Sequence, residues 1–253
     1  MICASGKLNA LMKPVASLFV ALVLLLTSSA QAQPAQTPDK PAPKLGADGQ
    51  PNPGFIKAHE SFVAIAKAGG VDLLFLGDSI TAGWKGQTAI WNAAFGKYKP
   101  ANFGIGGDRT QHVLWRIENG ELDGITPKVA VLMIGTNNSG TDTAEGIAAG
   151  ITAIVKAIHA KSPGTRVLLL AVFPRGDRPE GNFGAAQAKL KQVNAIISKL
   201  HDGKNVHYLD IGEQFLVNGA MSKDIMYDFL HLTPKGYEIW AKAIQDKLAE
   251  LMK

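Results

Sequence analysis

Five short, largely apolar runs constrain the fold of this chain more than any other feature. Each run is four to seven residues long and lacks the regular alternation of apolar and polar residues that marks a strand with one exposed face. Runs of this kind are typical of strands that are buried on both faces of a parallel sheet. They cover Asp72–Leu76, Asn102–Ile105, Val129–Ile134, Val167–Phe173 and Val206–Ile211.

Segments with a helical spacing of apolar residues alternate with these runs. They are Thr88–Tyr98, Thr110–Glu118, Ala144–Ala160, Ala185–Leu200 and Pro234–Leu251. The last of them follows Thr233, a good N-cap residue, and has proline at its first helical position. This alternation predicts an α/β fold: a three-layer α/β/α sandwich around a five-stranded parallel sheet.

The first 32 residues have the pattern of an export signal. Lys7 and Lys13 supply positive charge, Val15–Leu26 is apolar, and Ala30-Gln-Ala32 fits a signal-peptidase site. The apolar stretch is shorter than the roughly 20 residues that span a membrane. We therefore predict a periplasmic or secreted protein without a stable membrane partner. An uncleaved N-terminal anchor is the alternative.

The remaining chain divides into two parts. Residues 33–54 are rich in Pro, Gln, Ala, Lys and Gly and predict a flexible tether, whereas 55–253 predict one globular domain. Removal of residues 1–32 would take away the only cysteine, Cys3, and would lower the formal net charge from +5 to +3. The other charges are scattered, which argues against nucleic-acid binding. The oligomeric state stays open.

Polar residues and glycines follow the apolar runs, at the sheet edge where functional groups gather in such folds. A serine at a strand end, a histidine and a carboxylate are the parts of a serine esterase. Ser79 follows the first run, and Asp228 and His231 lie in the loop before the last helix. The other groups at this edge are Gly106-Gly107-Asp108-Arg109, Gly135-Thr136-Asn137-Asn138 and Pro174-Arg175-Gly176.

These segments resemble the SGNH (GDSL-type) hydrolase superfamily, which has a flavodoxin-like fold. Gly77–Ile80, Gly104–Asp108, Gly135–Asn138 and Asp228–His231 look like its four sequence blocks, in order. Within the superfamily, Asn102–Arg116 and Asp228–Thr233 are most similar to the catalytic subunits of intracellular platelet-activating factor acetylhydrolase. The resemblance runs from about Asp72 to the C-terminus and therefore identifies 55–253 as the hydrolase domain.

The resemblance implies a role for each matching residue. Ser79 is the nucleophile, His231 the base and Asp228 the residue that orients the base. The backbone N–H groups of Ser79 and Gly107 and the side-chain amide of Asn137 form the oxyanion hole. The third block has Asn138 where the superfamily usually has Asp, so the role of Asn138 stays open.

Adjacency and resemblance together predict that Ile80, Thr136 and Leu230 line a small acyl pocket. Asp108 is expected to cap the helix that begins near Arg109, and His112 is expected to pack. The other four histidines are expected to be solvated: His59, His159, His201 and His207. No cluster has convincing metal-ligand spacing, so neither a metal nor a cofactor is predicted.

The sequence therefore predicts an exported serine esterase that removes a short acyl group, acetyl above all, from a small ester or an O-acetylated glycan. A carbohydrate O-acetylesterase is the preferred form. A lysophospholipase or thioesterase of the same superfamily is the first alternative. A non-catalytic glycan-binding relative is the alternative from a different class.

Overall fold

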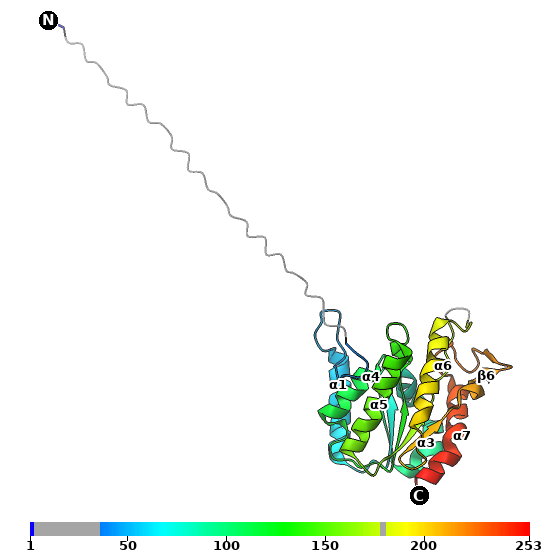
Figure 1. Cartoon of the computed structure of the whole chain (residues 1–253). Coiled ribbons are helices and arrows are strands. Elements are labelled where there is room, and N and C mark those ends of the chain that lie inside the picture. The colour runs from blue at the N-terminus through cyan, green and yellow to red at the C-terminus, as the bar shows by residue number, and fades with distance from the viewer. Residues whose placement is uncertain (3–35, 178–180) are drawn as a thin grey trace. The chain divides into compact units, whose positions relative to one another are not determined.

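The computed structural model describes residues 1–2, 36–177 and 181–253. The predicted export signal lies outside these residues apart from Met1 and Ile2, and so does the start of the predicted tether, 33–35. From residue 36 onward the described chain forms one compact unit, shown in Figure 1. No helix within the described residues is long and apolar enough to cross a membrane.

A five-stranded parallel sheet lies at the centre of this unit, in the strand order β2-β1-β3-β4-β5. Leu73 lies opposite both Pro100 and Val129, so the first three strands end level with one another. This sheet confirms the predicted fold class. The strands are β1 (Leu73–Gly77), β2 (Pro100–Gly104), β3 (Val129–Met133), β4 (Arg166–Leu170) and β5 (Val206–Leu209).

Helices cover both faces of the sheet (Figure 1), and the strand residues are therefore buried on both sides. Leu74 and Leu76 belong to the apolar cluster that faces α1, α4, α5 and α6, whereas Leu73 and Phe75 belong to the cluster that faces α3 and α7. The helices are α1 (Pro53–Ala68), α2 (Ser79–Ala82), α3 (Thr88–Phe95), α4 (Thr110–Arg116), α5 (Ala144–Lys161), α6 (Ala185–Ile197) and α7 (Pro234–Leu251).

Two features of the structure were not predicted. Helix α1 begins at Pro53, where Asn52 caps it by accepting a hydrogen bond from the Phe55 N–H at 3.0 Å. A short hairpin follows β5 and pairs β6 (Leu216–Val217) with β7 (Ala220–Met221). Both features lie outside the five-stranded sheet.

The predicted flexible tether is wrong for residues 36–52, which we call the strap. The Thr110 hydroxyl donates to the Pro38 carbonyl oxygen at 2.8 Å, and the Ala42 N–H donates to the Gln111 carbonyl oxygen at 3.2 Å. The strap has no apolar periodicity, and polar contacts with the start of α4 fix it instead. Amino-acid composition does not reveal hydrogen bonds between residues that are far apart in the sequence.

Candidate active site

Ser79 lies where β1 turns into α2. A Cβ on Gly77 would lie 2.4 Å from the Met133 carbonyl oxygen, so glycine is required for this close approach. Asp78 caps α2, because its Oδ1 accepts a hydrogen bond from the Ile80 N–H at 2.9 Å. Ser79 is therefore the first residue of α2, half-buried at the carboxyl edge of the sheet.

Asp228 and His231 share one loop before α7. Asp228 Oδ1 accepts hydrogen bonds from the backbone N–H of His231 at 2.7 Å and of Leu230 at 3.2 Å. The Tyr227 N–H donates to the His231 carbonyl oxygen at 3.1 Å. Phe229 has a φ of +61°, which is uncommon for a residue other than glycine and makes the turn tight. The shape of this loop is thus fixed largely by its own residues.

The three predicted catalytic side chains form one hydrogen-bonded chain. Ser79 Oγ lies 2.9 Å from His231 Nε2, and His231 Nδ1 lies 2.9 Å from Asp228 Oδ2. A carboxylate can only accept, so Nδ1 must carry the proton that is donated to it. In the neutral ring Nε2 is then the acceptor, and it faces the hydroxyl of Ser79.

Two loops that follow the strands on either side of β1 carry the other predicted oxyanion donors, Gly107 and Asn137. A Cβ on Gly106 would lie 4.0 Å from Ser79 Cβ, which places the loop after β2 beside Ser79. Asn137, after β3, donates through Nδ2 to the Asp108 carbonyl oxygen at 2.8 Å. This bond joins the two loops, and the amide keeps its second N–H for another acceptor.

The family is decided by comparison with known sequences. The profile of the GDSL-like Lipase/Acylhydrolase family matches residues 75–239, well over half of the chain. The chain belongs to this GDSL-like family. It is accordingly a serine ester hydrolase, as predicted.

Named relatives of the GDSL-like chain agree with this assignment. Human platelet-activating factor acetylhydrolase IB subunit alpha1 is 38% identical over 226 residues, which cover 88% of this chain and 93% of the relative. The rat alpha2 subunit is 39% identical over 216 residues, covering 83% and 90%. These matches confirm the predicted superfamily and its predicted branch.

Solved structures with lower identity support the fold alone. A GDSL-like lipase from Bacteroides thetaiotaomicron has a TM-score of 0.63 and 20% identity, with 76% of this chain and 97% of that one covered. Est24, a carbohydrate acetylesterase from Sinorhizobium meliloti, has a TM-score of 0.57 and 21% identity, with 71% and 98% covered.

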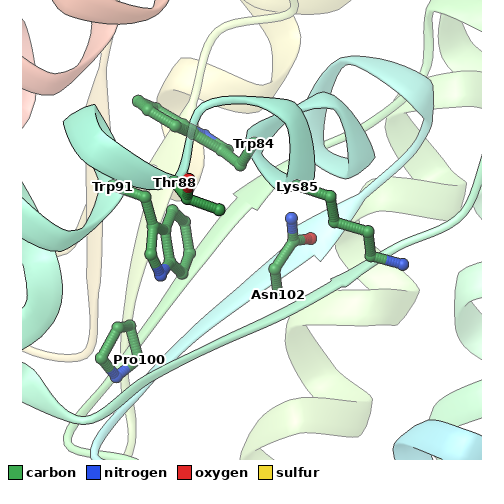
Figure 2. Close-up of a pocket in the computed structure, with 6 residues that line it drawn as sticks. All are labelled: Trp84, Lys85, Thr88, Trp91, Pro100 and Asn102. Atoms are coloured by element: carbon green, nitrogen blue, oxygen red, sulfur yellow. The ribbon is translucent and has the colours of Figure 1, made fainter.

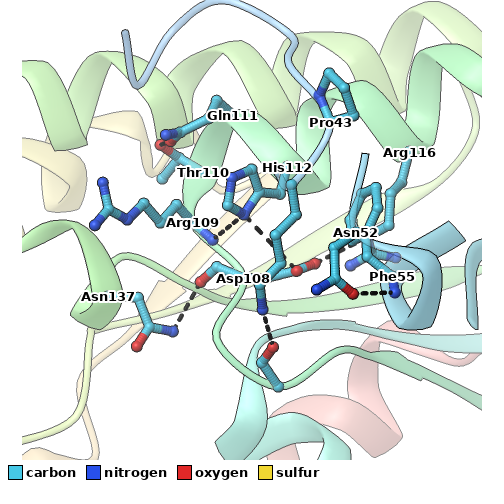
Figure 3. A network of polar contacts seen from close by, with 12 residues as sticks. Pro43, Asn52, Phe55, Asp108, Arg109, Thr110, Gln111, His112, Arg116 and Asn137 are labelled. Carbon is cyan, nitrogen blue, oxygen red and sulfur yellow. Dashed lines mark hydrogen bonds and ion pairs between the residues drawn. The ribbon is translucent and has the colours of Figure 1, made fainter. Parts of the chain in front are cut away.

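Asp108, in the second GDSL block, belongs to a buried network of charged side chains. Figure 3 shows its contacts with Arg116 and Asn137. Arg116 is fully buried; its Nε donates to Asp108 Oδ2 at 3.0 Å and its Nη1 donates to Glu121. His59 Nδ1 lies 3.1 Å from the same Glu121. Burial raises the pKa of Asp108 to about 6, although the guanidinium of Arg116 opposes that change. The network fixes Asp108, and its carbonyl oxygen in turn holds Asn137.

The expected cap role of Asp108 is wrong. Arg109 occupies the N-cap position of α4, and its backbone N–H donates to His112 Nδ1 at 3.1 Å. The carboxylate of Asp108 instead pairs with Arg116, two helical turns further along. His112 is buried, as expected; burial and the nearby charges of Lys44 and Arg109 lower its pKa to about 3.

Two of the four histidines expected to be solvated are buried. His59 contacts Glu121 beneath α1. His207 lies in the edge strand β5, where its Nε2 is 3.3 Å from the Lys204 carbonyl oxygen. The prediction was wrong because partners distant in the sequence, or a local turn, satisfy these rings inside the protein.

The three residues predicted to line the acyl pocket all lie in the interior. Ile80 and Leu230 are 1% and 6% exposed and belong to the apolar cluster on the α7 side of the sheet. The Thr136 hydroxyl and carbonyl oxygens both accept hydrogen bonds from the Arg175 guanidinium. Each of the three adjoins a catalytic group in the sequence, and their part in an acyl pocket stays a prediction.

Two residues near the candidate site were missed from the sequence. Tyr227 is 57% exposed, and its ring stacks on that of His231 at 5.9 Å with an angle of 18°. Its position directly before Asp228 could have drawn attention to it. Lys44 comes from the strap, and its Nζ donates to the Gly106 carbonyl oxygen at 2.6 Å. No sequence signal connects it with a glycine 62 residues later.

A separate cavity of about 270 Å³ lies beside the edge strand β2 (Figure 2). None of its lining residues belongs to the predicted catalytic side chains or to the loops of the predicted oxyanion donors, so it is not part of the candidate site. They are Trp84, Lys85, Thr88, Trp91, Pro100 and Asn102. Over the described residues, no group of three or more His, Cys, Asp or Glu side chains is arranged to hold a metal ion.

Proposed function

We propose that this serine ester hydrolase acts through Ser79, His231 and Asp228 and forms an acyl-enzyme on Ser79. The observation that carries the proposal is the pair of 2.9 Å contacts that link the hydroxyl, the imidazole and the carboxylate in one line. A serine hydroxyl is a poor nucleophile at neutral pH, and an adjacent imidazole that can accept its proton makes it competent.

The proposed reaction has two halves. His231 Nε2 takes the proton of Ser79 as Oγ attacks the ester carbonyl, and the N–H groups of Ser79, Gly107 and Asn137 stabilise the resulting oxyanion. His231 then gives the proton to the leaving alcohol. Water, activated by the same imidazole, releases the acid from Ser79 in the second half. Asp228 holds the ring and stabilises its charged form.

The assignment of the nucleophile is tested by Ser79→Ala, with Ser198→Ala as the matched control. Ser198 Oγ donates only to the Ala195 carbonyl oxygen, in an exposed helical turn far along the chain. We expect hydrolysis of p-nitrophenyl acetate to fall by about 10⁴- to 10⁶-fold in Ser79→Ala and to stay at the wild-type level in Ser198→Ala. Substantial activity in folded Ser79→Ala would remove the assignment.

We further propose an O-acetylated glycan as the substrate. The support is the predicted export signal, the short-acyl pocket expected from Ile80, Thr136 and Leu230, and the exposed ring of Tyr227 beside His231. A flat aromatic surface of this kind can pack against the leaving alcohol. A panel of acetylated plant and bacterial glycans, assayed for acetate release, tests this. Faster turnover of decanoyl than of acetyl p-nitrophenyl esters would contradict the short-acyl part.

An acetylated phospholipid is the second candidate substrate. It is favoured by the 38% identity to a platelet-activating factor acetylhydrolase subunit over 88% of this chain. The same assay decides between the two when an acetyl phospholipid is added to the glycan panel. A higher kcat/KM on the phospholipid would replace the glycan proposal.

Export itself is a proposal that rests on residues 1–32. We expect the mature protein to begin at Gln33 and to be found outside the cytoplasm. N-terminal sequencing of the protein from fractionated cells measures this. An intact Met1 in the membrane fraction would establish the alternative, an uncleaved anchor.

A further inference from the structure

The loop that carries Gly107 is a turn whose central peptide group can adopt two orientations. The Asp108 N–H donates to the Ile105 carbonyl oxygen at 3.2 Å, and Gly107 has a φ of +72°. These features fit a type II turn with Gly106 and Gly107 at its centre. Types I and II differ mainly by a rotation of the peptide between the two central residues.

That peptide contains the Gly106 carbonyl, which would repel an oxyanion, and the Gly107 N–H, which would stabilise one. The Gly106 carbonyl and the Gly107 N–H point in opposite directions because the peptide bond is planar and trans. In one orientation the N–H faces the site, and in the other the carbonyl oxygen would replace it. Two adjacent glycines pay little for either state, and both are exposed, so their own packing does not select one.

Lys44 supplies a constraint on this choice. Its Nζ donates to the Gly106 carbonyl oxygen at 2.6 Å, and a Cβ on Gly107 would lie 2.7 Å from the same Nζ. A carbonyl held by an ammonium group fixes the opposite direction for the Gly107 N–H. A donor of this kind is charged, which roughly doubles the strength of the bond compared with a neutral pair.

The strap holds the Lys44 backbone in place for this contact. The Asn52 N–H donates to the Lys44 carbonyl oxygen at 2.7 Å, just before α1 begins. On the other side of Lys44, the Ala42 N–H is bonded to the Gln111 carbonyl oxygen in α4. Lys40 lies in the same strap but is exposed, and its Nζ is 4.0 Å from Asp39. The two lysines therefore differ in what they contact.

We propose that Lys44 is a positioning residue of the oxyanion hole: it holds the Gly106–Gly107 peptide in the orientation that presents the Gly107 N–H to the substrate. This inference rests on the proposed role of Ser79 as nucleophile. The ammonium group also places a positive charge beside the loop that is proposed to bind the substrate oxygen, on which negative charge develops during acyl transfer. Both effects act on the transition state more than on the bound ester.

The test compares Lys44→Met, Lys44→Arg and Lys40→Met in the mature protein with p-nitrophenyl acetate. We expect kcat to fall roughly tenfold in Lys44→Met, less than the about 10²–10³-fold loss typical of removing an oxyanion donor itself. KM should change little. Lys44→Arg restores a charged donor and should recover most of kcat. Lys40→Met removes the same charge from the strap and should behave as the wild type.

The outcomes separate this inference from the proposed function. If Ser79→Ala is inactive and Lys44→Met keeps wild-type kcat, the role of Lys44 is overturned while the nucleophile stands. If Lys40→Met loses as much as Lys44→Met, general charge rather than the Gly106 contact is responsible, and the inference is again overturned. If Lys44→Met loses activity only in proportion to unfolded protein, as measured by circular dichroism at the assay temperature, the residue is structural and the inference fails.

Discussion

The loop of Asp228 and His231 and the loop of Gly106 and Gly107 are held beside Ser79, the proposed nucleophile, by different means. In the first, the carboxylate of Asp228 contacts both the ring and the backbone N–H of His231. In the second, the orientation of the decisive peptide is held from the strap, 62 residues away in the sequence. The contacts that fix the first loop can be inferred from its own motif, whereas the contact of Lys44 with the second loop cannot.

Among the variants of these two loops, Asp228→Asn is expected to have the largest effect, because it removes the carboxylate that contacts both the ring and the backbone N–H of His231. An amide can donate as well as accept, so it allows His231 to place its proton on Nε2, which then cannot accept from Ser79. We expect kcat for p-nitrophenyl acetate to fall by about 10⁴-fold. Asp224→Asn, an exposed carboxylate in the same segment, is the control and should keep its activity. A loss below about tenfold would show that the base needs no such partner.

Gly107→Ala tests the other loop and is expected to cost about 10²-fold in kcat. The new Cβ would lie 2.7 Å from Lys44 Nζ at a φ of +72°. Gly219→Ala is the matched control, because Gly219 has a φ of +78° with nothing within 4 Å of a new Cβ. Both variants should lose some stability, measured as a lower melting temperature. Equal losses of kcat in the two would trace the effect to backbone strain alone.

Asn137→Ala and Asn138→Ala compare two neighbours with different roles. Asn138 is fully buried and bonds to Thr110, Gln111 and Asp142, so its loss should destabilise the fold by about 1–3 kcal/mol. Asn137 makes one bond to the neighbouring loop, so its loss should lower kcat by about 10²-fold with a smaller change in stability. Urea titration and kinetics measure the two quantities. A loss of kcat in Asn138→Ala and a loss of stability in Asn137→Ala would contradict these two assignments.

Asp78→Asn is expected to change the pH dependence of stability. Burial raises the pKa of Asp78 from 3.8 to about 7. Between about pH 4 and pH 7 the folded protein thus keeps a proton that the unfolded chain releases, so this residue destabilises the fold increasingly as pH rises through that window. The upper limit is about 4 kcal/mol. Asn cannot titrate, so the variant should gain stability relative to the wild type over the same range. The free energy of unfolding of both proteins is measured by urea titration across this pH range. The same pH dependence in the wild type and the variant would contradict the prediction.

The sheet and the catalytic chain could be predicted because their signals are local. Each strand is a continuous apolar run, and the turn after Leu76 needs the glycine and the capping Asp78 that are visible beside Ser79. Asp228 and His231 are three positions apart, a spacing that places both in one turn. Here the pattern of the sequence and the physical requirement coincide.

The remaining parts of the site depend on partners that no local pattern reveals. Asp108 stands where a helix cap is expected, yet its partner Arg116 lies eight residues later. His59 is buried because Glu121, 62 residues later, meets it beneath α1. The strap has the composition of a flexible tether, but hydrogen bonds to α4 hold it in one conformation. Long-range polar pairing decides each of these cases.

The most direct test of the account is to label the protein with a fluorophosphonate, which forms a stable bond with an activated serine oxygen, and to locate the label by peptide mass spectrometry. We expect one label per chain, on the peptide that contains Ser79, and a large drop in labelling rate in His231→Ala. A label on another serine, or an unchanged rate without the imidazole, would contradict it.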